Sequence, residues 1–227
     1  ERVNDFALLE ARYLVGRMLA GRDDLRAAFA GSGTRLAVMA HDEMTTDVPE
    51  HSDLEPADWW DRRARGLGAT TVRPAVSCGE ENLLEFPGDP YAAENILVHE
   101  FGHVIHEMGL RRVDEGFDAR LRAARDAALA AGLWEGTYAA TNPSEYWAEG
   151  VQSWFDTNRA DDAQHNHVDT RAEIEAYDAG LAALLAEAFP GNEWRYRRPS
   201  ERPEPAHLAG WDPAGAPRFA WPERLKD

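Results

Sequence analysis

The run from residue 95 to 106 is apolar except for a few ionisable side chains, and these include His99 and His103, four positions apart. On an α-helix this spacing places both imidazoles on one side, about 40° apart around the axis and about 6 Å apart along it. Glu100 follows the first histidine and can act as general base toward a metal-bound water. The run therefore predicts a mostly buried helix that supplies two ligands of a Zn²⁺ site.

The alternative interpretation is that both histidines are ordinary core residues. Imidazoles and a carboxylate on an apolar helix would then need other buried partners, because leaving them unpaired costs several kcal/mol. A metal ion supplies that partner, so we favour the metal interpretation. Hydrolytic zinc sites usually take three protein ligands and keep one position for water, so a third ligand must come from another segment.

A second predicted helix carries the candidates for that ligand. Asn142 is a good N-cap for it, and Glu145 and Glu149 lie one turn apart on one face. Glu145 could instead complete a capping box with Asn142, and Glu149 could be a surface charge. The pattern alone leaves the choice between the two glutamates open. His106, a further turn along the first helix, is expected to support the site without binding the ion.

The HEFGH run, together with Tyr138-Ala-Ala-Thr-Asn-Pro-Ser-Glu-Tyr-Trp-Ala-Glu149, resembles the catalytic domain of the anthrax lethal factor group of gluzincin metallopeptidases. In that family a tyrosine stands seven residues before the glutamate ligand, and a second glutamate follows four residues after it; Tyr138, Glu145 and Glu149 share this spacing. The resemblance covers roughly residues 70–160. It implies that Glu145 is the third zinc ligand, that Tyr138 stabilises the transition state and that Glu149 steadies a ligand histidine.

The predicted fold class is α+β: a zincin-like metallopeptidase domain in which a small mixed sheet packs on the metal-site helix and the C-terminal half is mainly helical. We expect one domain over residues 1–227, with helices and sheet in 1–90, the metal-site helices in 91–160, and a last helix and wrapping tail in 161–227. Trp194, Trp211 and Trp221 are expected to anchor that tail. Strands are expected at 34–40, 70–76 and 82–86, and helices at 5–21, 24–30, 56–65, 95–106, 117–131, 142–155 and 178–189.

Composition restricts the partners of this chain. The formal net charge is −17, which opposes approach to nucleic acid or to an anionic membrane, so neither is expected as a partner. Cys78 is the sole cysteine, so it can form no internal disulfide and is expected to be a small structural residue.

His41 and His51 are expected in a solvated loop. His165 and His167 are expected in a loop that packs over the active site or is exposed, with a second metal site as the less favoured alternative.

The sequence therefore predicts a zinc-dependent hydrolase, and first a peptidase that acts on a peptide or protein substrate. Alternatives from other classes are a zinc hydrolase of a non-peptide amide or ester, and a non-catalytic binding protein that a metal stabilises. The segment after Trp147, with the later His165-Asn-His-Val168, is also similar to a group of secreted bacterial and fungal proteins with the same metal motif, which favours secretion. No oligomeric state, and no choice between endopeptidase and exopeptidase action, is predicted.

Overall fold

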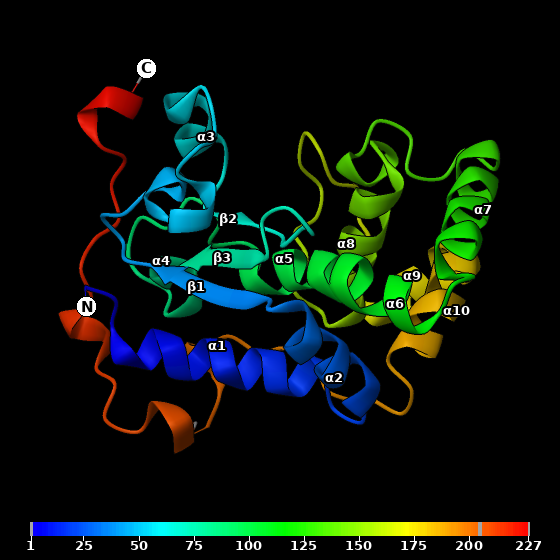
Figure 1. Ribbon diagram of the computed structural model, residues 1–227, viewed down its shortest axis with the longest axis horizontal. Coiled ribbons are helices and arrows are strands. Elements are labelled where there is room, and N and C mark those ends of the chain that lie inside the picture. Colours follow the sequence, from blue (N-terminus) through cyan, green and yellow to red (C-terminus); the bar gives the residue numbers. More distant parts are fainter. Residues whose placement is uncertain (1, 204–205, 227) are drawn as a thin grey trace.

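The computed structural model describes residues 2–203 and 206–226 and is a mixed α+β structure, about 52% helical, with one small sheet (Figure 1). The expected α+β class is confirmed at this level. Its helices are α1 Asp5–Met18, α2 Asp23–Ser32, α3 Ala57–Arg63, α4 Glu80–Leu83, α5 Ile96–Val104, α6 Arg111–Val113, α7 Phe117–Ala130, α8 Pro143–Trp154, α9 Arg171–Tyr177 and α10 Ala179–Ala188. Short 3-10 turns and a π-helical turn, Ile105–Leu110, connect or extend several of them.

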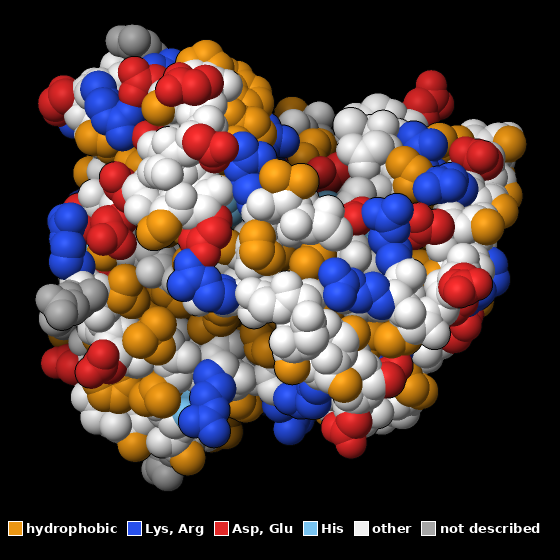
Figure 2. Space-filling view, viewed as in Figure 1, with side chains coloured by type: hydrophobic (Ala, Val, Ile, Leu, Met, Phe, Trp, Pro, Cys, Tyr) orange, Lys and Arg blue, Asp and Glu red, His pale blue; other side chains and the backbone are white. Residues whose placement is uncertain are grey.

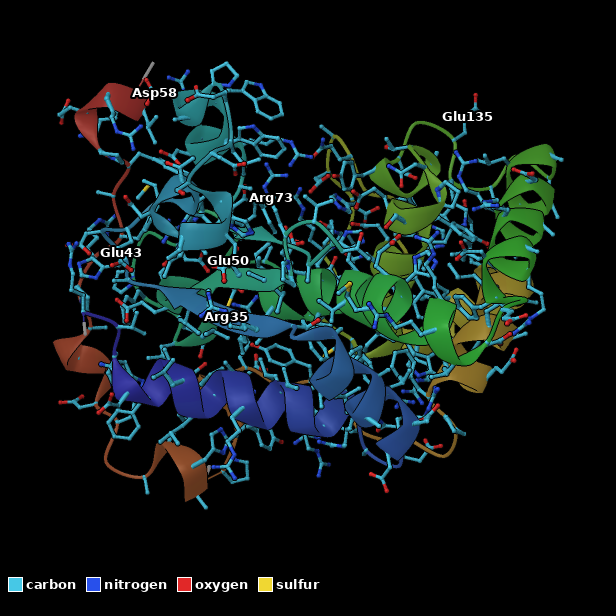
Figure 3. All side chains as sticks on the ribbon, in the orientation of Figure 1. Arg35, Glu43, Glu50, Asp58, Arg73 and Glu135 are labelled. Carbon is cyan, nitrogen blue, oxygen red and sulfur yellow. The ribbon has the colours of Figure 1, made fainter. Side chains whose placement is uncertain are left out.

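The sheet has three strands in the order β1-β3-β2. β1, Arg35–Met39, runs parallel to β3, Ala75–Gly79, with Arg35 opposite Ala75. β2, Gly66–Leu67, pairs antiparallel with β3 and forms one edge of the sheet. On the β1 side, Arg35 forms an ion pair with Glu50, and Figure 3 shows the two side chains close together in front of the sheet.

Two of the three expected strands need correction. The strand expected at 70–76 begins later, because the Thr70 N–H donates to the Arg73 carbonyl and closes a turn before β3. The strand expected at 82–86 is wrong, since residues 80–83 form the short helix α4. All four residues of α4 are buried although three of them are polar, so no periodic pattern of apolar residues marks this helix in the sequence.

The side chain of Asn82 in α4 connects this helix to the metal-site helix. Its Nδ2 donates to the carbonyls of Tyr91 and Glu94 at 3.0 Å, and its Oδ1 accepts from the N–H of Ile96, the first residue of α5. The loop before α5 is thus held to the sheet by a buried amide. The position of α5 is set at its first turn.

The core lies between the sheet, α1 and the pair α5 and α8, and Figure 1 shows α1 running below the sheet with α7, α9 and α10 grouped beyond α8. α5 and α8 approach closely at Gly102, where an added Cβ would lie 3.3 Å from Val151 Cβ. Trp147, fully buried, donates from its indole nitrogen to the Gly102 carbonyl at 2.9 Å. This contact fixes the distance between the two helices.

The C-terminal tail packs along α1 and α3; Trp194 and Trp211 contact the rest of the fold as expected, whereas the ring contact of Trp221 is with the tail itself. Trp194 contacts Tyr13 and Phe155, Trp211 contacts Phe6 and Phe86, and Trp221 contacts Phe219. The buried carboxylate of Glu10 in α1 accepts from Arg202 at 2.7 and 2.8 Å. Arg224 pairs with Asp58 and Asp61 of α3, which holds the last 3-10 turn, Glu223–Leu225, against that helix (Figure 1).

Candidate metal centre

The helix α5 carries His99 and His103 on one side. Its N-cap is Asn95, whose side chain accepts from the N–H of Val98, a local reason for the helix to begin there. The two Nε2 atoms lie 3.2 Å apart and the two ring centroids 4.9 Å apart. The four-residue spacing therefore places both imidazoles on one side of the helix, as predicted.

The helix α8 brings Glu145 to the same point. The Asn142 side chain accepts from the N–H groups of Ser144 and Glu145, so the predicted N-cap is confirmed. Glu145 Oε2 lies 3.2 Å from His99 Nε2 and 3.3 Å from His103 Nε2. One atom from each of the three residues lies within 4.8 Å of the others, a group that could hold a metal ion.

The tautomers of both histidines fit such an ion. His99 Nδ1 lies 2.7 Å from Gln152 Oε1, an oxygen that can only accept, so the proton sits on Nδ1 and the Nε2 lone pair is free. His103 Nδ1 lies 2.9 Å from Ser144 Oγ, which can accept a proton in the same way. Two imidazole lone pairs and a carboxylate then face one point. Such a set repels itself unless a cation lies between its members.

The electrostatics around His99 favour a cation. Burial opposes a charged imidazole there, yet the carboxylates of Glu145, Glu100 and Glu149 outweigh burial and raise the pKa of His99 to about 10. Glu145 is also buried, but when no metal is bound and His103 and His99 carry the extra proton, their hydrogen bonds and positive charge lower the pKa of Glu145. The potential that attracts a proton to His99 attracts a metal ion equally well.

Glu149 does not lie at the ion position. Its Oε1 is 3.5 Å from His99 Nδ1, on the side of the ring opposite Glu145, and its other oxygen accepts from Asn158 at 3.1 Å. Gln152, which sequence reasoning missed, lies nearer to His99. Gln152 Nε2 donates in turn to Glu94 at 3.0 Å, so a buried amide fixes the imidazole and is itself fixed.

His165 lies behind Glu149 in a loop that packs over the site. Its Nε2 lies 3.3 Å from Glu149 Oε2 and its Nδ1 2.8 Å from Asp162 Oδ1. Of the two placements expected for this loop, packed over the site or exposed to solvent, His165 has the first: it is buried and lines the cleft beside the candidate metal group. His167 instead packs edge to face on Tyr177, with ring centroids 5.4 Å apart.

The remaining histidines lie elsewhere. His106, expected beside the site, has its Nε2 2.8 Å from Asp118 Oδ1 and its ring against Phe117 and Trp147. The π-helical turn that follows α5 places it there, because its wider winding changes the direction of the side chain. The loop expected to be solvated around His41 and His51 is partly wrong: His51 is buried, and His41 contacts the buried Glu80 at 3.0 Å.

Two glycines let the strand segment lie against α5. A Cβ on Gly66 would be 3.0 Å from Glu100 Cγ and 2.5 Å from a methyl carbon of Ile96, and a Cβ on Gly68 would be 2.7 Å from His103 Cβ. The sequence pattern showed only that these glycines end a helix. Their close approach to α5 depends on a tertiary contact that no local pattern indicates.

Tyr138 begins the 3-10 turn Tyr138–Ala140 before α8, and its ring centroid is 6.4 Å from that of His99. Its backbone N–H donates to the Gln164 carbonyl at 2.7 Å, which ties the turn to the loop that contains His165. Burial, and then the negative charge of Glu145, raise the pKa of its hydroxyl, so Tyr138 stays a proton donor.

A cleft of about 190 Å³ opens beside the two helices. It lies between the end of α3 with β2 on one side and Tyr138 with the 158–168 loop on the other, where Figure 2 shows the surface hollowed. In Figure 3, Asp58 on α3 and Glu135 before Tyr138 mark the two sides of this hollow. The lining residues are Arg63, Ala64, Arg65, Gly66, Tyr91, Glu94, Ile96, His99, Glu100, Tyr138, Glu149, Arg159, Gln164 and His165.

Comparison with known proteins adds no name to this arrangement: no family model, curated protein or solved structure matches the chain. No helix within residues 2–203 and 206–226 combines the length and the apolar character that crossing a membrane requires. The geometry of the described residues defines a candidate metal centre of two histidines and one glutamate beside an open cleft.

Proposed function

We propose that this protein is a zinc-dependent peptidase of the gluzincin type, with His99, His103 and Glu145 as the metal ligands. The observation that carries the proposal is the convergence of these three side chains on one point beside a cleft that Glu100 and Tyr138 also line. Two imidazoles with one carboxylate are a ligand set typical of hydrolytic zinc, and a purely structural site would more often be closed by a fourth protein ligand.

When bound, zinc would lower the pKa of a water toward neutrality and polarise the carbonyl of the substrate. Glu100 takes a proton from the attacking water as its oxygen bonds to the carbonyl carbon. Glu100 then returns that proton to the leaving nitrogen as the carbon–nitrogen bond breaks. The Tyr138 hydroxyl donates a hydrogen bond to the carbonyl oxygen as negative charge develops on it.

The sheet edge supports a peptide as the substrate. β2 pairs with β3 on one side only, and its first residue, Gly66, lies against Glu100 and lines the cleft. An extended peptide that adds to this edge would satisfy its backbone groups and pass beside the general base. A strand edge can hydrogen-bond to the backbone of any peptide, whatever its side chains are. An ester or a glycan has no such regular row of backbone N–H and C=O groups to pair with the edge.

The test is hydrolysis of a mixed peptide library by zinc-loaded protein, with chelator-treated protein as the control. We expect cleavage that chelation abolishes and zinc restores. Glu100→Gln should keep the bound zinc and lose about 10²- to 10⁴-fold in rate, because it removes only the proton acceptor. Cleavage by this variant at near the parent rate would refute the role of Glu100.

A further inference from the structure

Arg63, the last residue of α3, has a position that the proposed reaction does not explain. It is exposed and lines the cleft. Its Nη2 donates to the Tyr138 hydroxyl at 3.4 Å, so the guanidinium lies beside the group that we assign to the oxyanion.

The backbone and side chain of Arg63 are both held. The guanidinium carbon lies 5.5 Å from the ring centroid of Trp59 and 5.7 Å from that of Trp60, within cation–π range. The Tyr91 hydroxyl donates to the Arg63 carbonyl at 3.0 Å. Two residues later, Arg65 makes a fully buried pair with Glu81 at 2.5 Å. These contacts orient the guanidinium toward the cleft before any ligand arrives.

Among residues 2–203 and 206–226, the charge of Arg63 has no carboxylate partner, unlike that of the other arginines of the cleft. Arg65 is neutralised by Glu81, and Arg159 lies 3.1 Å from Glu94 and 3.3 Å from Asp162. Within the part of the chain that the structure describes, no carboxylate oxygen lies within 4.0 Å of the Arg63 guanidinium. Among the three arginines that line the cleft, Arg63 is therefore the one whose charge is open to a ligand.

We infer that Arg63 binds a carboxylate of the substrate and makes the enzyme select peptides that carry one near the bond to be cut. A guanidinium offers parallel N–H donors that match a carboxylate in two hydrogen bonds. The carboxylate has two sources, an acidic side chain or the free C-terminus of the peptide. The inference rests on the proposed peptidase function for its setting, but binding tests it without catalysis.

The experiment compares four matched peptides for each position near the cleaved bond: the position holds Glu or Gln, and each of these two peptides is made as the free acid and as the C-terminal amide. Cleavage is followed by mass spectrometry with zinc-loaded parent protein, and binding by fluorescence anisotropy with zinc-loaded Glu100→Gln, which holds the peptide uncut. Arg63→Gln removes the charge, Arg63→Lys keeps it without the planar fork, and Arg63→Glu reverses it. Arg112→Gln is the matched control, an exposed arginine of α6 that lies outside the cleft.

We expect the parent to favour one acidic arm by about tenfold or more, the size of a charge-assisted hydrogen bond. Arg63→Gln should erase that preference, Arg63→Lys should keep part of it, and Arg63→Glu should prefer peptides with Lys at the same place. Arg112→Gln should leave it unchanged. The arm that shows the preference identifies the source of the carboxylate.

The inference is overturned if the parent shows no preference for either acidic arm, or if the preference survives in Arg63→Gln. A merely structural role of Arg63 would change folding or overall rate in all four peptides alike, and it would not reverse selectivity in Arg63→Glu. If the parent cuts nothing yet binds acidic peptides through Arg63, the peptidase proposal fails and the carboxylate site stands.

Discussion

Gln152 gives the sharpest test of how the metal centre is held. Its side chain is fully buried, with Oε1 2.7 Å from His99 Nδ1 and Nε2 3.0 Å from Glu94. In Gln152→Leu the imidazole keeps its burial and loses its acceptor, so the tautomer with a free Nε2 lone pair is no longer favoured. Loss of such a partner behind a metal ligand lowers affinity about 10- to 100-fold, which is about 1.4 to 2.8 kcal/mol.

The same substitution should lower the free energy of unfolding of the metal-free protein by about 1 to 3 kcal/mol, because a buried N–H and a buried carboxylate each lose a partner. Zinc affinity is measured by competition with a chromogenic chelator, and stability by urea unfolding. Gln152→Glu is the matched control: it keeps an acceptor for His99 and loses the donor to Glu94, so it should reduce stability while it keeps zinc affinity.

Parent-like zinc affinity in folded Gln152→Leu would refute this reasoning. If Glu149→Gln weakened zinc binding more than Gln152→Leu did, Glu149, at 3.5 Å, would be the residue that holds His99.

Two further predictions concern the surroundings of the site. Gly68→Ala should weaken zinc binding, because the added Cβ would lie 2.7 Å from His103 Cβ and displace a ligand. We expect an overpacking cost of about 1 to 3 kcal/mol. Zinc affinity is measured by chelator competition, and an affinity equal to that of the parent would contradict the prediction. His165→Gln should destabilise the metal-free protein more at pH 6 than at pH 9. Burial disfavours the His165 imidazolium, but Glu149 and Asp162 outweigh it and raise its pKa, so its stabilising charge is complete below about pH 6.5 and is lost as pH rises through the raised value. Urea unfolding at both pH values should show the difference, of about 1.5 to 3 kcal/mol at most, and equal losses would count against it.

Local signals in the sequence predicted the parts of the structure that depend on local contacts. Asn142 caps α8 as expected, and Asp178, the first residue of the expected helix 178–189, caps α10 by accepting from the Leu181 N–H. The four-residue spacing of His99 and His103 predicted their convergence, because a helix fixes it. Thr170 with Glu173 forms a capping box at α9, a signal that was present in the sequence and was missed.

Parts that depend on tertiary contacts could not be predicted in this way. The choice between Glu145 and Glu149 needed the packing of α8 on α5 through Gly102, and composition left both open. β3 begins late because of the turn that Thr70 and Arg73 close before it. The residues of β3 and α4 are all buried, so no alternation of polar and apolar positions marks where either element begins. Arg63 reaches the cleft only because α3 folds over it.

His99, His103 and Glu145 form a group that could hold a metal ion, and their role as zinc ligands is part of the proposed function. The resemblance to the anthrax lethal factor group predicted the ligand role of Glu145 and the proximity of Tyr138, and the geometry agrees with both placements. Zinc as the ion, and hydrolysis as the reaction, rest on the chemistry of the ligand set and the cleft.

The most direct measurement is the zinc content of the purified protein and three variants after loading with zinc and removal of the excess. The account predicts one equivalent for the parent and for Glu149→Ala, with at most weakened affinity in that variant, and close to none for His103→Ala and Glu145→Ala. Retention of one equivalent by Glu145→Ala, together with its loss from Glu149→Ala, would contradict the assignment of the metal centre.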